Sequence, residues 1–271
     1  MNDSPWKRYT PSAAEPWDVR RVVHLHRRAG FAATWGEIER DLLNGPDDAV
    51  DRMLSGRSRA AGQVAEFAEM ADVIGEAAVS SGNPDRLKAW WTFRMLFSPD
   101  PVAERLALMW HNHFATSNAK VDNLELMYGQ NVIFRDFGRA KFGDLLRTVV
   151  KDPALLLWLD AESNRRQHAN ENLARELMEL FTLGEGNYTE NDVKQAARAL
   201  TGWTVSRGRF RNVPEYHDAG EKTILGKTEA FAGSGLLDLL LRQSATAWRI
   251  AWRICDALFG EDLARPLAAT K

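Results

Sequence analysis

The chain has 271 residues, of which 45% are hydrophobic and 27% are charged, and its net charge at pH 7 is -2. This composition is typical of a globular protein with a sizeable core, and it excludes a disordered or fibrous chain. Because 35 basic residues nearly balance 37 acidic ones, no global field favours a nucleic acid, an anionic membrane or a polyanionic substrate. A local basic patch is compatible with the same balance.

The sequence also limits the location and the cysteine chemistry of the protein. No apolar run approaches the roughly 20 residues that a membrane-spanning helix needs, and residues 1–21 lack the apolar core of a secretory signal. We expect a cytoplasmic protein from the sequence as written, or an exported one if a signal segment precedes it. The single cysteine, Cys255, excludes an internal disulfide, and its apolar helical surroundings favour a core residue over a reactive thiol.

The first part of the chain predicts a loose arm followed by short helices. Residues 1–16 contain three prolines and little periodicity. Apolar spacing predicts a helix over 17–29, which we expect Gly30 to end in a left-handed conformation. Thr34 and Glu37 form a capping-box pattern at the start of the next helix.

Helical patterns then continue through the middle of the chain. Proline at the first helical position predicts helix starts at Pro46, Pro84 and Pro101. A longer, Ala-rich helix ends near Gly82. Further helices with apolar spacing are predicted over 123–138, 141–150 and 153–160.

Residues 203–228 change character, because apolar and polar residues alternate around glycine and proline. They predict one short β-hairpin or extended excursion, after which helices return over 234–243 and 244–260. We therefore predict a mainly α fold, an orthogonal, bundle-like arrangement of many helices. It forms a single domain over residues 17–271 that is incomplete at its C-terminus.

The six histidines lie in four short segments: His24 with His26, His111 with His113, His168, and His217. Such clustering is typical of a metal or acid–base site. In a helix, residues two apart point about 200° away from each other, so at most one histidine of each pair should face a shared site. We expect His26 to pack at the core edge, whereas the WHNHF segment falls where a long helix meets a polar loop.

The segment from His168 to Trp203 is the most distinctive part of the sequence. On a helical wheel its first half has an apolar stripe of Leu173, Ala174, Leu177, Leu180 and Phe181, and the opposite face carries Glu171, Asn172, Arg175, Glu176 and Glu179. One interpretation is a solvated face with ion pairs four residues apart. The other is a divalent-metal site with His111, His113, His168, Glu171 and Glu179 as ligands.

The rest of this segment and the loop around His217 allow further interpretations. Gly184 ends one helix, and Thr189 with Asp192 predicts a capping box at the next, which is favoured over a phosphate-binding loop. His217 lies in a polar loop where Asp218, Glu221 and Lys222 could orient or neutralise it, so catalytic and ordinary loop roles both stay open. Most of the ten tryptophans should be core, although a few could stack on sugar rings of a carbohydrate or cell-envelope substrate.

Several strings, in this order, resemble a bacterial family catalogued as domain of unknown function 1800: HLHRRAGF, ERLALMWHNHFATS, KDPALLLWLD, HANENLARELMELFTLGEGNYTENDVKQAARALTGW and HDAGEKTILG. The resemblance covers roughly residues 18–260, and it implies a longer protein of which this chain is a truncated member. It places His24, His111, His113, His168, Asn170, Glu171, Arg175, Glu176, Glu179 and His217 at motif positions. It also implies that His26 stands where relatives carry leucine.

Two hypotheses follow. The first is a metal-assisted hydrolase with the five ligands above, in which Glu176 acts as general base, Arg175 stabilises negative charge and His217 takes part in catalysis. The second is a non-catalytic binding or scaffold protein in which the same residues form a structural network of hydrogen bonds and ion pairs.

Overall fold

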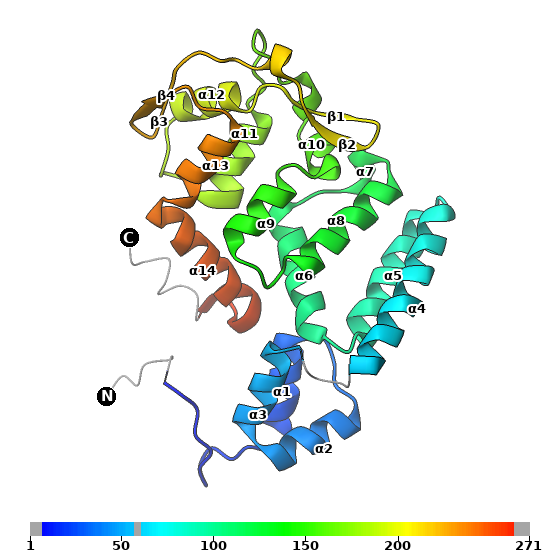
Figure 1. Ribbon diagram of the computed structural model, residues 1–271. Helices are drawn as coiled ribbons and strands as arrows, with labels where there is room; N and C mark the ends of the chain where they lie inside the picture. Colours follow the sequence, from blue (N-terminus) through cyan, green and yellow to red (C-terminus); the bar gives the residue numbers. More distant parts are fainter. Residues whose placement is uncertain (1–6, 57–60, 263–271) are drawn as a thin grey trace. The chain divides into compact units, whose positions relative to one another are not determined.

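The computed structural model describes residues 7–56 and 61–262, and most of these residues are helical (Figure 1). The predicted mainly α class is confirmed. The elements run in the order α1 (Val19–Ala29), α2 (Trp35–Asn44), α3 (Pro46–Leu54), α4 (Ala61–Ser80), α5 (Pro84–Phe97), α6 (Pro101–Phe114), α7 (Asn118–Val121), α8 (Leu124–Asp136), α9 (Phe142–Val149), α10 (Pro153–Trp158), η1 (Ala161–Ser163), α11 (Asn172–Glu176), η2 (Leu177–Thr182), α12 (Glu190–Ala199), β1 (Trp203–Ser206), β2 (Arg209–Asn212), η3 (Pro214–Tyr216), β3 (Lys222–Ile224), β4 (Lys227–Glu229), α13 (Gly233–Leu241) and α14 (Ser244–Phe259).

The described chain divides into two compact units, and each is treated by itself. Unit 1 holds residues 7–56, 61–106 and 255–262, and unit 2 holds residues 107–254. The single domain over 17–271 stays a prediction. Of the predicted arm, residues 1–6 lie outside the described residues, and the rest contains neither helix nor strand, with Arg8 paired to Asp47 at 2.7 Å.

In unit 1 the predicted helix starts are present, but the predicted left-handed helix end is not. Thr34 and Glu37 form the capping box of α2. Gly30 ends α1 with a φ of -142°, so that prediction was wrong. A Cβ at Gly30 would lie only 2.8 Å from the Cβ of Pro101, so close packing explains the glycine here.

Asp41 is the centre of a buried polar cluster in unit 1. Its carboxylate accepts hydrogen bonds from His26 Nε2 at 2.8 Å and from Arg52 Nη2 at 2.5 Å. His26 is only 4% exposed, whereas His24 is exposed. The two histidines therefore have different surroundings, as helical spacing predicts, and His26 is the one with a buried partner.

Two expectations from composition concern the described helices. None of these helices has an apolar stretch long enough to cross a bilayer. Cys255 is only half-buried near the end of α14 and does not belong to the buried core as predicted, although burial raises the pKa of its thiol.

Unit 2 is built around a cluster of aromatic rings. The ring of Phe114, at the end of α6, lies 5.0 Å from that of Phe181 and 5.8 Å from that of Phe134, between ring centroids. All three phenylalanines are buried. Helix α6 continues through both histidines of the WHNHF segment, so His111 and His113 occupy its last turn and not a polar loop.

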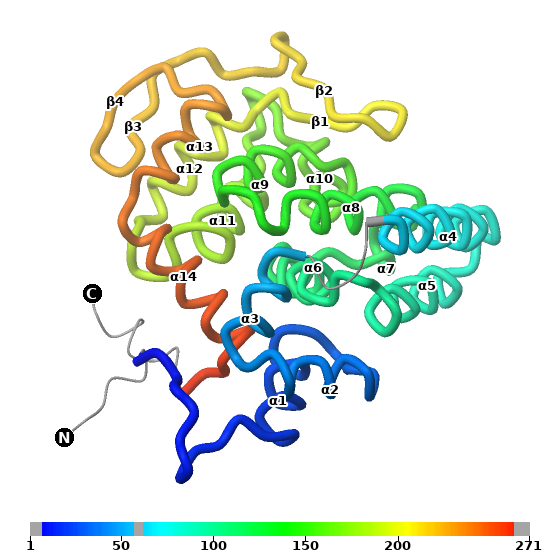
Figure 2. The backbone as a smooth tube through the Cα atoms, turned by 60° about the horizontal axis from the view of Figure 1, so that its bottom comes forward, coloured from blue at the N-terminus to red at the C-terminus, as the bar shows by residue number. Residues whose placement is uncertain are grey.

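The non-helical part of unit 2 contains two hairpins where the sequence predicted one. Antiparallel strands β1 and β2 form the first hairpin, and β3 and β4 form the second. Figure 2 shows that they lie apart: β3 packs against α12, and β1 packs against α10. Both turns have two residues with positive φ, Arg207–Gly208 and Leu225–Gly226, a conformation that suits the right-handed twist of two-residue hairpins.

The helix that carries the predicted stripe is not a regular α-helix along its whole length. After α11 it continues as η2, a π-helical segment in which the N–H of Leu183 bonds to the carbonyl of Met178 at 2.8 Å. The wider turn changes which residues face inward. Leu180, which the wheel placed in the stripe, is 37% exposed, and Met178 is buried instead.

Candidate functional site

The five predicted metal ligands have five different sets of neighbours. The ring of His111 packs edge-on against Phe134, with 6.1 Å between the centroids. His113 contacts the backbone of η2. His168 is exposed in a turn whose backbone pairs with Arg165. Glu171 and Glu179 contact different partners, described below.

His113 is held in a buried, aromatic environment that keeps its imidazole neutral. Its Nε2 lies 3.2 Å from the carbonyl oxygen of Phe181, and rings of Trp110, Phe114 and Phe142 surround it. Burial, followed by the nearby charge of Arg253, lowers the pKa of His113 to about 3. A neutral imidazole must protonate Nε2 to donate to that carbonyl, so Nε2 offers no lone pair to a metal.

Arg175 joins the two helices on either side of the Gly184 turn. Its Nη1 and Nη2 bond to the two oxygens of Glu190 at 2.8 and 2.7 Å, and Nη2 also bonds to Glu171 at 3.0 Å. Glu171 precedes α11 and Glu190 begins α12, so both carboxylates lie at helix starts, where negative charge is favourable. The bidentate pair lowers the pKa of Glu190.

Glu176 and Glu179 lie on the next turn. Tyr188 donates its hydroxyl proton to Glu179 at 2.8 Å, and burial together with this bond raises the pKa of Tyr188 to about 12. Glu176 is half-buried, and burial and the charge of Glu179 raise its pKa. Among the described residues Glu176 has no hydrogen-bond partner, so it is the one predicted catalytic group on this helix whose carboxylate is unengaged.

These positions do not assemble a metal centre. Within residues 7–56 and 61–262, no three His, Cys, Asp or Glu side chains are arranged so that they could hold a metal ion. Binding of a divalent ion stays a prediction for elemental analysis.

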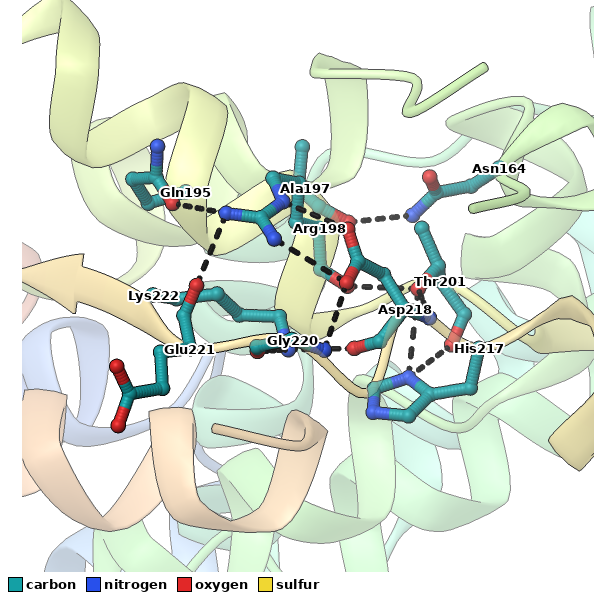
Figure 3. A network of polar contacts seen from close by, with 10 residues as sticks. All are labelled: Asn164, Gln195, Ala197, Arg198, Thr201, His217, Asp218, Gly220, Glu221 and Lys222. Atoms are coloured by element: carbon teal, nitrogen blue, oxygen red, sulfur yellow. Dashed lines mark hydrogen bonds and ion pairs between the residues drawn. The ribbon is translucent and has the colours of Figure 1, made fainter. Parts of the chain in front are cut away.

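A second polar cluster connects the end of α12 to the loop that contains His217 (Figure 3). Arg198 forms a bidentate pair with Asp218, with Nε–Oδ2 at 2.7 Å and Nη2–Oδ1 at 3.1 Å. Its Nη1 also bonds to Gln195 and to the carbonyl of Glu221. The guanidinium lowers the pKa of Asp218, so both partners stay charged at neutral pH.

Thr201, and not the acidic or basic residues of its own loop, orients His217. His217 Nδ1 lies 2.9 Å from the Thr201 carbonyl oxygen, and the Thr201 hydroxyl accepts the N–H of Asp218 at 2.8 Å. The expectation that Asp218, Glu221 or Lys222 orients His217 was wrong. Because Nδ1–H donates a hydrogen bond to this carbonyl, the neutral ring has its lone pair on Nε2, which has no partner among the described residues.

Lys222 stabilises the same loop from inside. It is 1% exposed, and its Nζ donates to the carbonyl oxygens of Asp218 at 2.5 Å and Gly220 at 2.8 Å. Burial lowers the pKa of its ammonium group. The loop is thus folded around two cations, Arg198 and Lys222, that bind its carboxylate and its backbone.

Asparagine side chains hold the turn that carries His168. Asn164 Oδ1 accepts the N–H of Asn170 at 3.0 Å, and Asn164 Nδ2 donates to the carbonyl of Ala197 at 3.1 Å. Asn170 also donates to Ser163 and to the carbonyl of Asp160. The asparagine of the HANEN motif therefore fixes a turn, whereas the side chain of His168 points to no described partner.

The sequence did not indicate Arg198, Thr201 or Asn164 as parts of a site. Each has a partner far away in the chain: Thr201 contacts His217 across 16 residues, Arg198 contacts Asp218 across 20, and Asn164 contacts Ala197 across 33. The available signal was the segment ARALTGW, where an arginine lies in the last turn of an Ala-rich helix and a threonine follows just after its end.

The family model described as protein of unknown function (DUF1800) matches residues 24–270. The chain belongs to this family. A search of curated proteins and a search of solved structures found no match. Because membership in DUF1800 names no activity, the function has to be inferred from the contacts above.

Proposed function

We propose that this protein is a non-catalytic binding or scaffold protein whose His/Glu/Arg residues form a structural network. The observation that carries the proposal is the engagement of Arg175, since both terminal nitrogens of its guanidinium bond to carboxylates of the chain itself. An arginine that stabilises a reacting anion needs N–H groups directed at the substrate. Here they join α11 to α12.

Most of the other polar groups of the site support the same interpretation, and Glu176 and His168 are the exceptions. Asp218 is paired with Arg198, Glu179 accepts from Tyr188, and His113 donates to a backbone carbonyl. Buried or half-buried polar groups that are satisfied in this way fix the arrangement of helices and loops. The network therefore supplies a rigid framework, and binding falls to surfaces outside it.

Elemental analysis and melting with and without a chelator test this proposal. We expect no stoichiometric divalent ion and no change in Tm on adding EDTA, because no bound ion contributes to folding. Arg175→Gln should lower Tm, whereas Arg166→Gln, which removes an exposed arginine of the same unit, should leave it unchanged. A bound ion that stabilises the fold and is lost in Glu179→Ala would overturn the proposal in favour of the metal-assisted hydrolase.

One observation favours the enzyme alternative. The Thr201 carbonyl fixes the tautomer of the half-buried His217, and the Nε2 of this histidine is unpartnered among the described residues, as a general base requires. The alternative predicts hydrolysis of activated ester or phosphoester substrates that is lost in His217→Gln and retained in His24→Gln. If no such substrate is turned over, or if both variants are equally active, the second candidate fails.

A further inference from the structure

The β1–β2 hairpin has one face packed on unit 2 and one face directed outward. In its register Trp203 pairs with Asn212 and Val205 with Phe210 on one face. The rings of Trp203 and Phe210 pack edge-on with centroids 5.4 Å apart, and Lys151 Nζ lies within 6 Å of both ring centroids. This face anchors the hairpin, so its opposite face is held in a fixed position.

The outward face carries two pairs of an arginine and a hydroxyl. Thr204 is paired with Arg211, and Ser206 is paired with Arg209. Residues directly opposite each other have Cβ atoms about 5 Å apart, so each arginine stands on the same face as a hydroxyl-bearing residue on the neighbouring strand. The two pairs follow each other along the ribbon at about 7 Å, a spacing comparable to that of successive phosphates in a nucleic acid strand.

The arginines of this hairpin are exposed and unpaired. Arg207, Arg209 and Arg211 are exposed, and none of them has an ion pair or hydrogen bond with another described side chain. The segment Trp203–Asn212 contains no acidic residue, although the whole chain has a net charge of -2. Most other charged groups of unit 2 discussed above are engaged, so this concentration of free guanidinium groups is local to the hairpin.

We propose that the outward face of the β1–β2 hairpin binds double-stranded DNA through its phosphates. Arginine and hydroxyl groups together supply the donors that most phosphate contacts use. A two-stranded β-ribbon fits the major groove of B-DNA, whereas the major groove of A-form RNA is too deep and narrow for side chains to read. This inference rests on the proposed function, because it names the partner class of a binding protein.

The geometry favours a duplex over other anionic partners. Single-stranded nucleic acid is usually bound on exposed aromatic side chains on which bases stack. The aromatic residues of this hairpin, Trp203 and Phe210, lie on its packed face. Association with an anionic membrane surface usually adds exposed apolar side chains to the basic ones, and the outward face has only arginine, serine and threonine.

Fluorescence anisotropy with a labelled DNA duplex of about two helical turns tests the proposal. The full chain should bind with an affinity that falls as salt rises from about 50 to 200 mM. The double variant Arg209→Gln/Arg211→Gln should raise Kd roughly tenfold and reduce the slope of log K against log salt by about 2, one for each phosphate contact. Its Tm should be unchanged, because neither side chain contacts the core.

The control is Arg20→Gln/Arg27→Gln, which removes two exposed arginines seven residues apart on α1 and changes the net charge equally. Equal weakening by both double variants, or no duplex binding by the unaltered chain, overturns the proposal. The proposal is also overturned if the chain binds single-stranded DNA or anionic phosphatidylglycerol vesicles as tightly as duplex DNA, and the hairpin variant loses this affinity to the same extent. If the protein does not bind the duplex but is metal-free and unaffected by EDTA, only the proposal of DNA as the partner is refuted. If the protein holds a metal ion that stabilises the fold, the proposed function is refuted as well.

Discussion

His113 Nε2 donates a hydrogen bond to the carbonyl oxygen of Phe181 at the end of the π-helical segment η2. Arg249 Nε donates to the preceding carbonyl, that of Leu180, at 2.8 Å. The last carbonyls of a helix have no amide partner within it, and a basic or imidazole side chain can take that place. The WHNHF and LMELFT segments are therefore linked by helix capping, which explains this histidine without a metal.

The buried, neutral state of His113 predicts a stability that decreases in mild acid. Its pKa is about 3 in the folded protein against about 6.5 when exposed, so below pH 6.5 the unfolded chain binds a proton that the folded chain does not. Between pH 6.5 and 5 this difference should cost about 2 kcal/mol of unfolding free energy. Urea denaturation at both pH values should detect the loss in the unaltered chain.

The matched variants for this prediction are His113→Gln and His24→Gln. His113→Gln lacks the titrating group and should lose that part of the pH dependence, while His24→Gln, at an exposed position, should keep it. If the unfolding free energy changes with pH by the same amount in all three proteins, His113 is not buried in its neutral form.

Asp152 should change the stability with pH in the opposite direction to His113, because its contribution is lost as the pH rises. Burial raises its pKa to about 6, although it also caps α10 and accepts from Gln130 Nε2 at 2.6 Å. The folded chain therefore holds a proton that the unfolded chain has lost, and this stabilisation disappears as pH rises through 6. Relative to the unaltered chain, Asp152→Asn, which can still cap the helix, should gain about 1 kcal/mol between pH 5 and 7. A difference in unfolding free energy between the two proteins that does not change with pH would contradict this prediction.

The parts of the structure that the sequence predicts are those determined by neighbouring residues. Thr189 and Asp192 form the expected capping box, and Pro84 occupies the predicted start of α5. Each of these signals needs only residues within one helical turn. The mainly α class follows from many such signals, and the apolar stripe of α11 is largely as predicted.

The contacts of the site could not be predicted in the same way. Asp192 also accepts the N–H of Leu225, and His217 bonds to Thr201, across 33 and 16 residues respectively. A helical wheel assumes one pitch, so it could not show that η2 widens and turns Leu180 outward. The exposed basic face of β1–β2 depends on strand register, which the alternating pattern alone left open.

The ion pair between Arg175 and Glu190 should stabilise the turn between α11 and α12. We expect Glu190→Gln to lower Tm by about 2 °C. Arg175→Gln, which also loses the bond to Glu171, should lower Tm at least as much. The double variant should lower Tm no further than Arg175→Gln alone, because its second change removes a partner of a pair that is already broken. The effect should shrink in high salt, since Glu190 is exposed. If the decreases in Tm of the two single variants add up in the double variant, the two residues act independently. That result is expected for an arginine whose guanidinium is free to bind a substrate.

Gly233, at the start of α13, should be intolerant of any side chain. A Cβ there would lie 2.1 Å from Cζ2 and 2.5 Å from Cε2 of Trp203, so the indole that anchors β1 would have to move. We expect Gly233→Ala to cost about 1 to 3 kcal/mol of unfolding free energy, as overpacking of a core does. Urea denaturation measures this cost directly.

The control for this change is Gly129→Ala, within α8 of the same unit. A Cβ at Gly129 meets nothing within 4 Å, and alanine is a better helix former than glycine, so this variant should gain about 0.5 to 1 kcal/mol. The two substitutions are chemically identical, so opposite signs of their changes in unfolding free energy would reflect the different surroundings of the two glycines. Because Trp203 anchors the hairpin, Gly233→Ala should also weaken duplex binding, whereas Gly129→Ala should not. If Gly233→Ala changes neither the stability of the protein nor its duplex binding, the indole of Trp203 does not anchor the hairpin.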